Sequence, residues 1–158
     1  MSSCRIGSPV CKNLCLTVWL LIALAVCRII PPAFAQTGPL AYVAVRDSNA
    51  VVVIDTSTNT IVNSITVGGS PFDVALTPDG SRAYVSNFFN DSASVIDLAT
   101  NTVVATVIGL GGRPSGVAVA PDGQRVYIAN GSGSNIWIVD AVTNTLIGSI
   151  GVGQNPTP

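Results

Sequence analysis

The stretch SPFDVALTPDGSRAYVSN, residues 70–87, decides the fold of this chain. It holds two apolar runs of strand length, residues 72–77 and 82–86, on either side of a turn that contains Pro78 and Gly80. Proline sets the backbone φ at the second position of a tight turn, and glycine accepts the left-handed backbone that other residues resist. β-Branched and aromatic residues around such a turn favour paired strands. The stretch therefore predicts a β-hairpin.

The same pattern recurs along the chain with a period of 42 or 43 residues. The landmarks that keep this period are the tyrosines Tyr42, Tyr84 and Tyr127, the aspartates Asp55, Asp97 and Asp140, the threonines Thr58, Thr100 and Thr143, and the prolines Pro71, Pro114 and Pro156. A fixed period of this length is typical of proteins in which each repeat is one supersecondary unit. We therefore divide the chain into approximate repeats at residues 39–80, 81–123 and 124–158.

Each repeat contains four short apolar runs, which in the middle copy occupy residues 72–77, 82–86, 93–98 and 102–108. Each run has the length of a strand, and none has the period of a helix. Four antiparallel strands in about 40 residues form one blade of a β-propeller. The predicted fold class is all-β, with propeller repeats of four antiparallel strands. A β-sandwich is the alternative, although a sandwich requires no constant period.

Residues 70–87 and 94–107 resemble the repeat of the YVTN family of β-propellers. The motif that names the family begins here at Tyr42, Tyr84 and Tyr127. The resemblance covers the chain after residue 39 and implies a seven-bladed propeller, as in surface-layer proteins and exported YncE-like proteins. It also implies that the run starting at Pro71 is the innermost strand of a blade. Most such proteins bind partners or build surfaces, but neighbouring families carry haem or act as lactonases.

The predicted strands do not complete a ring. The first of them, residues 40–45, corresponds to the second strand of a blade, and two full blades follow, so that eleven strands form about three blades. Closed propellers have four to eight blades. The expectation we favour is that the chain is part of a longer propeller. A head-to-tail ring of several copies and an open array capped by a partner are the alternatives, so self-association or additional blades are expected.

Residues 1–35 are predicted to be a signal peptide. Arg5 and Lys12 precede an apolar run of thirteen residues, 14–26, and cleavage is expected after Ala35. This run is short for a membrane span. The prediction places the repeat domain, residues 36–158, outside the cell, in the periplasm or on the cell surface. An uncleaved N-terminal anchor and a lipoprotein signal ending at Cys27 are the alternatives.

The composition of the repeat domain limits the kinds of catalytic and metal sites that it can form. All four cysteines lie in residues 1–35, and the remainder holds four arginines and eight aspartates but no His, Glu or Lys. A scattered, net acidic charge argues against nucleic acid and anionic membranes as partners. Without His or Cys, one chain cannot build a Ser–His–Asp triad or the usual zinc and haem ligand sets. We therefore expect no cofactor and no enzymatic activity.

Candidate contact residues lie in the loops that leave the second strands and enter the innermost strands. The former loops, residues 46–50, 87–92 and 130–135, are predicted to differ in length and content. The candidates are Phe72, Asp73, Phe88, Phe89, Asn90 and Arg113. Aromatic side chains dominate interface energetics, so this face predicts a protein or glycan partner. For Phe88 and Phe89 the alternative is that one aromatic side chain packs under its loop and the other is incidental. For Arg113 the alternative is a solvated side chain without a partner.

The function predicted from these patterns is that of a non-enzymatic exported propeller, with a binding or cell-surface structural role through the loops on one face. A small-molecule or redox-related enzyme, or its accessory subunit, acting at the channel mouth is the alternative. Five aspartates recur at repeat landmarks before or within turns, and we interpret them as structural caps. They are Asp55, Asp79, Asp97, Asp122 and Asp140.

Overall fold

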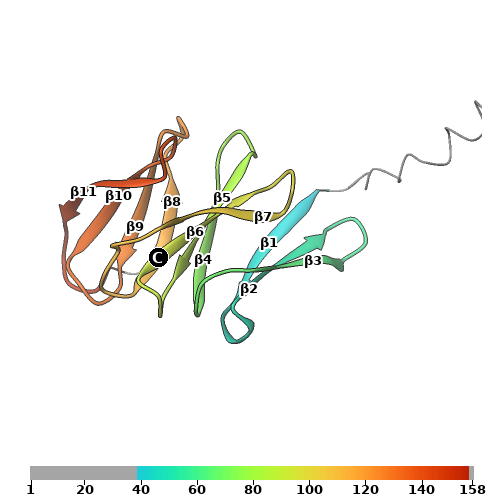
Figure 1. Ribbon diagram of the computed structural model, residues 1–158, viewed down its shortest axis with the longest axis horizontal. Helices are drawn as coiled ribbons and strands as arrows, with labels where there is room; N and C mark the ends of the chain where they lie inside the picture. The colour runs from blue at the N-terminus through green and yellow to red at the C-terminus, as the bar shows by residue number, and fades with distance from the viewer. Residues whose placement is uncertain (1–38, 157–158) are drawn as a thin grey trace, which may run out of the picture. The chain divides into compact units, whose positions relative to one another are not determined.

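A computed structural model of the protein describes residues 39–156, and the predicted signal peptide lies outside these residues. Eleven strands form three antiparallel sheets, which we call blades 1 to 3 (Figure 1). Blade 1 contains β1 (Leu40–Val45), β2 (Ala50–Asp55) and β3 (Thr60–Thr66); blade 2 contains β4 (Pro71–Leu76), β5 (Arg82–Asn87), β6 (Ser92–Asp97) and β7 (Thr102–Val107); blade 3 contains β8 (Pro114–Val119), β9 (Arg125–Asn130), β10 (Asn135–Asp140) and β11 (Thr145–Gly151). A short 3-10 helix, η1 (Arg46–Ser48), joins β1 to β2.

This architecture confirms the predicted propeller repeats of four antiparallel strands. In every blade each strand pairs with its neighbours in sequence, so the blades are simple meanders. The four strands of blade 2 begin and end within one residue of the predicted runs. Blade 1 has three strands in the described part of the chain, and its first strand corresponds to the second strand of the other blades. No helix within residues 39–156 is long and apolar enough to cross a membrane.

The core lies between the blades rather than within one sheet. One buried cluster joins blades 1 and 2 and contains Val51, Val53, Val85 and Ile96. A second cluster joins blades 2 and 3 and contains Tyr84, Val95, Val107, Val126, Ile128 and Val139. The innermost strand β4 packs against both β1 and β8. Successive side chains of a strand point to opposite faces of the sheet, so alternate residues pack against the preceding blade and the following blade.

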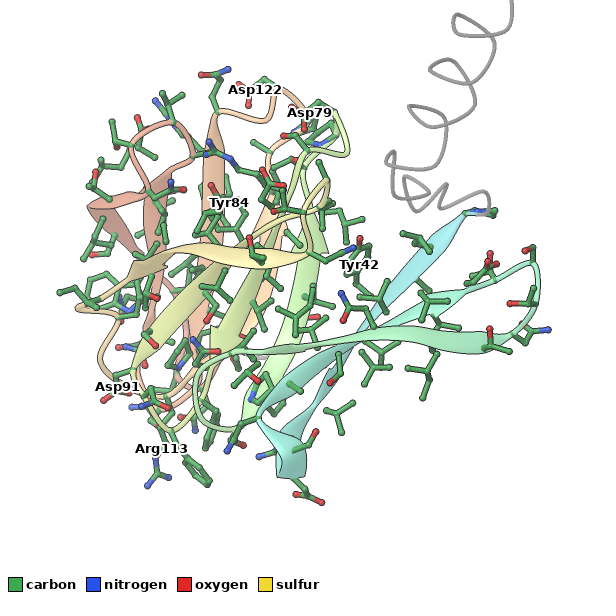
Figure 2. All side chains as sticks on the ribbon, turned by 45° about the vertical axis from the view of Figure 1, so that its right-hand side comes forward. Tyr42, Asp79, Tyr84, Asp91, Arg113 and Asp122 are labelled. Carbon is green, nitrogen blue, oxygen red and sulfur yellow. The ribbon has the colours of Figure 1, made fainter. Side chains whose placement is uncertain are left out.

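Two of the recurring tyrosines, Tyr42 and Tyr84, each link their blade to the next one by a hydrogen bond. The Tyr42 hydroxyl donates to Asn101 Oδ1 at 2.9 Å, and the Tyr84 hydroxyl donates to Asn144 Oδ1 at 2.8 Å. Figure 2 shows both tyrosines among the strands. Burial raises the pKa of both hydroxyls, so both remain protonated donors at neutral pH. Asn101 and Asn144 have φ of 53° and 55°, a left-handed conformation that Asn tolerates.

The turn that decides the fold adopts the expected geometry. The N–H of Gly80 donates to the carbonyl of Thr77 at 2.9 Å, and Gly80 has a φ of 67°. Gly123 repeats this turn in blade 3, with a φ of 71°. Proline at the second position and glycine at the left-handed position therefore have the roles that the sequence predicts.

Candidate functional site

The connections between strands divide into two ends of the blades. The turns at residues 56–59, 77–81, 98–101, 120–124 and 141–144 form what we call the hairpin end; the segments at residues 46–49, 67–70, 88–91, 108–113 and 131–134 form the loop end. Figure 2 shows Asp79 and Asp122 at the first end and Asp91 and Arg113 at the opposite one. The three loops between second and third strands each have four residues. The prediction that they differ in length is wrong, because in every blade this loop joins the same two adjacent antiparallel strands. Their content does differ.

Three phenylalanines form a ladder at the loop end. The rings of Phe72 and Phe88 stack with centroids 5.8 Å apart and planes 22° apart. The ring of Phe89 meets Phe88 edge-on at 5.5 Å. Phe72 and Phe88 are half-buried, whereas Phe89 is 71% exposed. Of the two adjacent phenylalanines in the loop, Phe88 therefore packs against Phe72, as one alternative held, and Phe89 faces solvent.

Two arginines from different blades flank this ladder. The guanidinium carbon of Arg46 lies 5.1 Å from the centroid of Phe72 and 5.6 Å from that of Phe88. The guanidinium carbon of Arg113 lies 5.7 Å from the centroid of Phe88. Each such contact is worth about 0.5–1 kcal/mol at an exposed site. We call Arg46, Phe72, Phe88, Phe89 and Arg113 the Arg–Phe cluster.

Arg46 is the member of this cluster that the sequence-based prediction missed. It lies in η1, and both it and Arg113 are exposed. Its Nε donates to Ser70 Oγ at 3.3 Å, which helps to orient the side chain. The repeat contains a signal for it, because Arg46 occupies the same position after β1 that Phe88 occupies after β5. A comparison of equivalent positions in the repeats could therefore have identified Arg46 as a candidate from the sequence.

Hydrogen bonds between neighbouring loops hold the cluster in place. The Asn90 side-chain oxygen accepts from the N–H of Gly69, and Asp91 Oδ1 accepts from the N–H of Arg113 at 2.9 Å. Arg113 has a φ of 60°, an uncommon conformation for its residue type. The bond from Asp91 offsets part of that cost, which is about 1 kcal/mol or more. Asn90 and Asp91 therefore fix the backbone of neighbouring loops at Gly69 and Arg113. The bond from Asp91, in blade 2, keeps Arg113 close to Phe88.

Asp73 makes no contact with the arginines or phenylalanines of the cluster that the structure records, and its carboxylate connects two innermost strands. Its Oδ2 accepts from the N–H of Val117 in β8 at 2.8 Å, and its Oδ1 accepts from the N–H of Val74 at 2.8 Å. The residue sits where β4 departs from regular pairing, between Pro71 and Val74. Both carboxylate oxygens are thus engaged with backbone, which ties blade 2 to blade 3.

A pocket of about 380 Å³ lies at the hairpin end, between blades 2 and 3. Asp79, Arg82, Asp122 and Ala141 are among its lining residues, and Arg82 Nη1 donates to the Ala141 carbonyl at 2.9 Å. Asp79 and Asp122 each accept backbone N–H groups of their own turns. Within residues 39–156, three or more His, Cys, Asp or Glu side chains nowhere gather closely enough to hold a metal. The pocket is therefore lined by turn-forming groups, and the Arg–Phe cluster is the better candidate site.

Comparison with known proteins supports the fold. No model of a protein family matches the chain, and no curated protein matches it either. Among solved structures it is similar to the hydrazine synthase of Kuenenia stuttgartiensis, with 27% identity, a TM-score of 0.72 and coverage of 77% of this chain and 35% of that one. It is also similar in fold to the dihydro-heme d1 dehydrogenase NirN, determined in complex with DHE, with 21% identity, a TM-score of 0.62 and coverage of 78% and 29%. This chain thus spans about a third of the length of these structures.

Proposed function

We propose that this chain belongs to an exported, non-enzymatic propeller of the YVTN type that binds a partner at its loop end. The observation that carries the proposal is the Arg–Phe cluster, in which two exposed guanidinium groups lie over stacked rings. The partner we infer is a protein or glycan that presents carboxylate or sulfate groups. Residues 1–35 support the export in this proposal, because they have the three parts of a signal peptide.

The two arginines of the cluster are pre-organised for binding. Arg46 and Arg113 come from different blades, but contact with Phe88 restricts the motion of both side chains. A guanidinium that lies over a ring keeps its N–H edge free to bind a carboxylate or sulfate through two parallel hydrogen bonds. Less side-chain entropy is then lost when the ligand binds. The exposed ring of Phe89 adds apolar area beside the charges.

An enzyme or its accessory subunit is the second candidate, because the similar solved structures include a synthase and a dehydrogenase. The absence of His, Glu, Cys and Lys after residue 35 weakens this candidate, since those residues supply most general bases near neutral pH. Catalysis by the purified protein that Asp73→Asn abolishes, with the fold retained, would favour it.

Binding to two anionic probes tests the proposal. Heparin represents a sulfated glycan and poly-L-glutamate an acidic peptide, and affinity is measured by titration at low and physiological salt. The double variant Arg46→Ala/Arg113→Ala is expected to lose affinity at least about tenfold for the bound probe, by loss of two charged contacts. The control matched in charge to each single variant, Arg46→Ala or Arg113→Ala, is Arg125→Ala at the hairpin end, which should bind as the wild type does. Equal losses in the three single variants would mean that only overall charge matters and would refute a loop-end site.

A further inference from the structure

The three blades each contribute a different exposed side chain to the loop end. Arg46 comes from the segment after β1, Phe89 from the segment after β5, and Arg113 from the segment before β8. Blade 2 packs between blades 1 and 3, and both guanidinium carbons lie within 5.7 Å of the centroid of Phe88 in blade 2. The surface therefore presents a positive charge, an aromatic pair and a second positive charge.

The ring of Phe89 is open to a ligand. It contacts Phe88 with an angle of 66° between the ring planes, and the residue remains 71% exposed. The face of an aromatic ring carries negative partial charge, so it attracts C–H groups, which carry positive partial charge. A pyranose sugar presents several such C–H groups on one face of its ring. An acidic peptide chain has no comparable ring beside its carboxylates.

Two exposed asparagines at the loop end are held with their NH₂ groups outward. Asn49 Oδ1 accepts from the N–H of Ser70 at 2.8 Å, and Asn90 Oδ1 accepts from the N–H of Gly69. Since each partner is an N–H group, the side-chain atom that faces it is the oxygen, and the NH₂ group on the same carbon points away from the backbone. Each amide therefore offers N–H donors of fixed direction, which suit the hydroxyl and ring oxygens of a sugar.

The loop end carries balanced charge. Its segments hold two arginines, Arg46 and Arg113, and two aspartates, Asp47 and Asp91. The overall charge of this end therefore gives a polyanion no long-range attraction. An anionic ligand gains its affinity from short-range contacts with the guanidinium groups, the open ring and the amides. A ligand that combines acidic groups with sugar rings and hydroxyls meets all three, whereas a plain acidic chain meets one.

We propose that the partner at the loop end is an acidic polysaccharide, whose pyranose rings carry carboxylate or sulfate groups. This inference rests on the function proposed above and limits it to one class of partner. One pyranose ring lies with its C–H face on Phe89, and the acidic groups bind the guanidinium groups of Arg46 and Arg113. Sugar oxygens accept from the amides of Asn49 and Asn90. Because the amides and guanidinium groups are already oriented, little side-chain entropy is lost on binding.

The test is calorimetric titration of the protein, purified after expression of the full chain, with matched probes. They are an oligogalacturonate, the same oligomer with its carboxylates methyl-esterified, and poly-L-glutamate with the same number of charges. The oligogalacturonate is expected to bind about tenfold more tightly than poly-L-glutamate, because only the sugar brings rings and hydroxyls. The esterified oligomer should bind at least about tenfold more weakly than the acid, because it cannot pair with the arginines. Dextran sulfate carries sulfate in place of carboxylate and shows which of the two groups the site prefers.

Phe89→Leu is the deciding variant, because leucine keeps an apolar side chain but has no ring face. Phe89 is 71% exposed, so this variant should fold as the wild type does. It is expected to lower the affinity for the better-bound acidic glycan about tenfold and to leave the affinity for poly-L-glutamate unchanged. The matched control is Val104→Ala in β7, which replaces another exposed apolar side chain and should change neither affinity.

Two results would overturn the glycan as the partner. They are equal affinities for the acidic glycans and poly-L-glutamate, and equal losses of both kinds of probe in Phe89→Leu. If the affinity for poly-L-glutamate still falls in Arg46→Ala/Arg113→Ala, the proposed function stands and only the glycan is excluded. If neither the acidic glycans nor poly-L-glutamate bind, the proposed function fails as well.

Discussion

The hairpin end and the loop end are built from the same repeats, but their side chains do different things. At the hairpin end the carboxylates of Asp55, Asp97 and Asp140 each accept a backbone N–H of their own turn at 2.8 Å. At the loop end the corresponding positions hold different residues in each blade, and Arg46 and Phe88 meet there across a blade boundary. The side chains that cap the turns at the hairpin end thus recur from repeat to repeat. Among the side chains that vary at the loop end, Arg46, Phe89 and Arg113 are exposed and therefore available to a partner.

Replacement of Tyr84 should give the largest effect and would sharpen this contrast. Tyr84 is fully buried, and its hydroxyl bonds to Asn144 and Ala141 at the hairpin end of blade 3. Tyr84→Ala is expected to lower the free energy of unfolding by about 3–5 kcal/mol, since it leaves a cavity. Phe89→Ala, at the exposed tip of the loop end, should change it by less than about 0.5 kcal/mol. Urea unfolding measures both, and comparable losses would break the comparison.

The loop end does contain backbone that cannot vary, and Gly112 identifies it. Gly112 has a φ of 96°, and a Cβ there would collide with the side chain of Asn130. Gly112→Ala is expected to destabilise the protein by about 1–3 kcal/mol through strain and clash. Gly111→Ala is the matched control, because a Cβ at Gly111 meets open space. If the two variants unfold at the same urea concentration, the packing of Gly112 against Asn130 does not restrict this loop.

Acidification should affect stability least, and it should act through the hairpin end. Hydrogen bonds from the Thr77 and Ser81 side chains and the Ser81 N–H lower the pKa of Asp79 from 3.8 to about 2. Similar bonds from Ser57 and Thr100 lower the pKa of Asp55 and Asp97. A carboxyl with a lowered pKa in the folded state stabilises it above the unfolded pKa, and that contribution is lost as pH falls.

The expected outcome is a small decrease in the urea midpoint between about pH 4 and pH 2, small because these groups are exposed. Asp79→Asn should reduce the slope in that window, since it removes the group with the largest shift. A midpoint that rises as the pH falls would contradict the role of these aspartates as turn caps.

Local chemistry made the blades predictable from the sequence. The Pro78–Gly80 turn and the alternation of β-branched residues each act over a few residues, and the period repeats them, so the sequence predicts the strands β4 to β7 to within one residue. The same reasoning identified the recurring aspartates as turn formers, which their hydrogen bonds to Ser57, Ser81 and Thr100 support.

Only the tertiary structure decided which loops meet. Phe72, Phe88 and Arg113 were all candidates, but their contact and the presence of Arg46 depend on how blade 1 stacks against blade 2. Asn90 was a candidate contact residue, and its oxygen accepts from Gly69 of a neighbouring loop. Such distances are set by the packing of whole sheets. A one-dimensional pattern therefore predicts each blade and its turns, while the neighbours of a side chain follow from the angle at which one blade packs on the next.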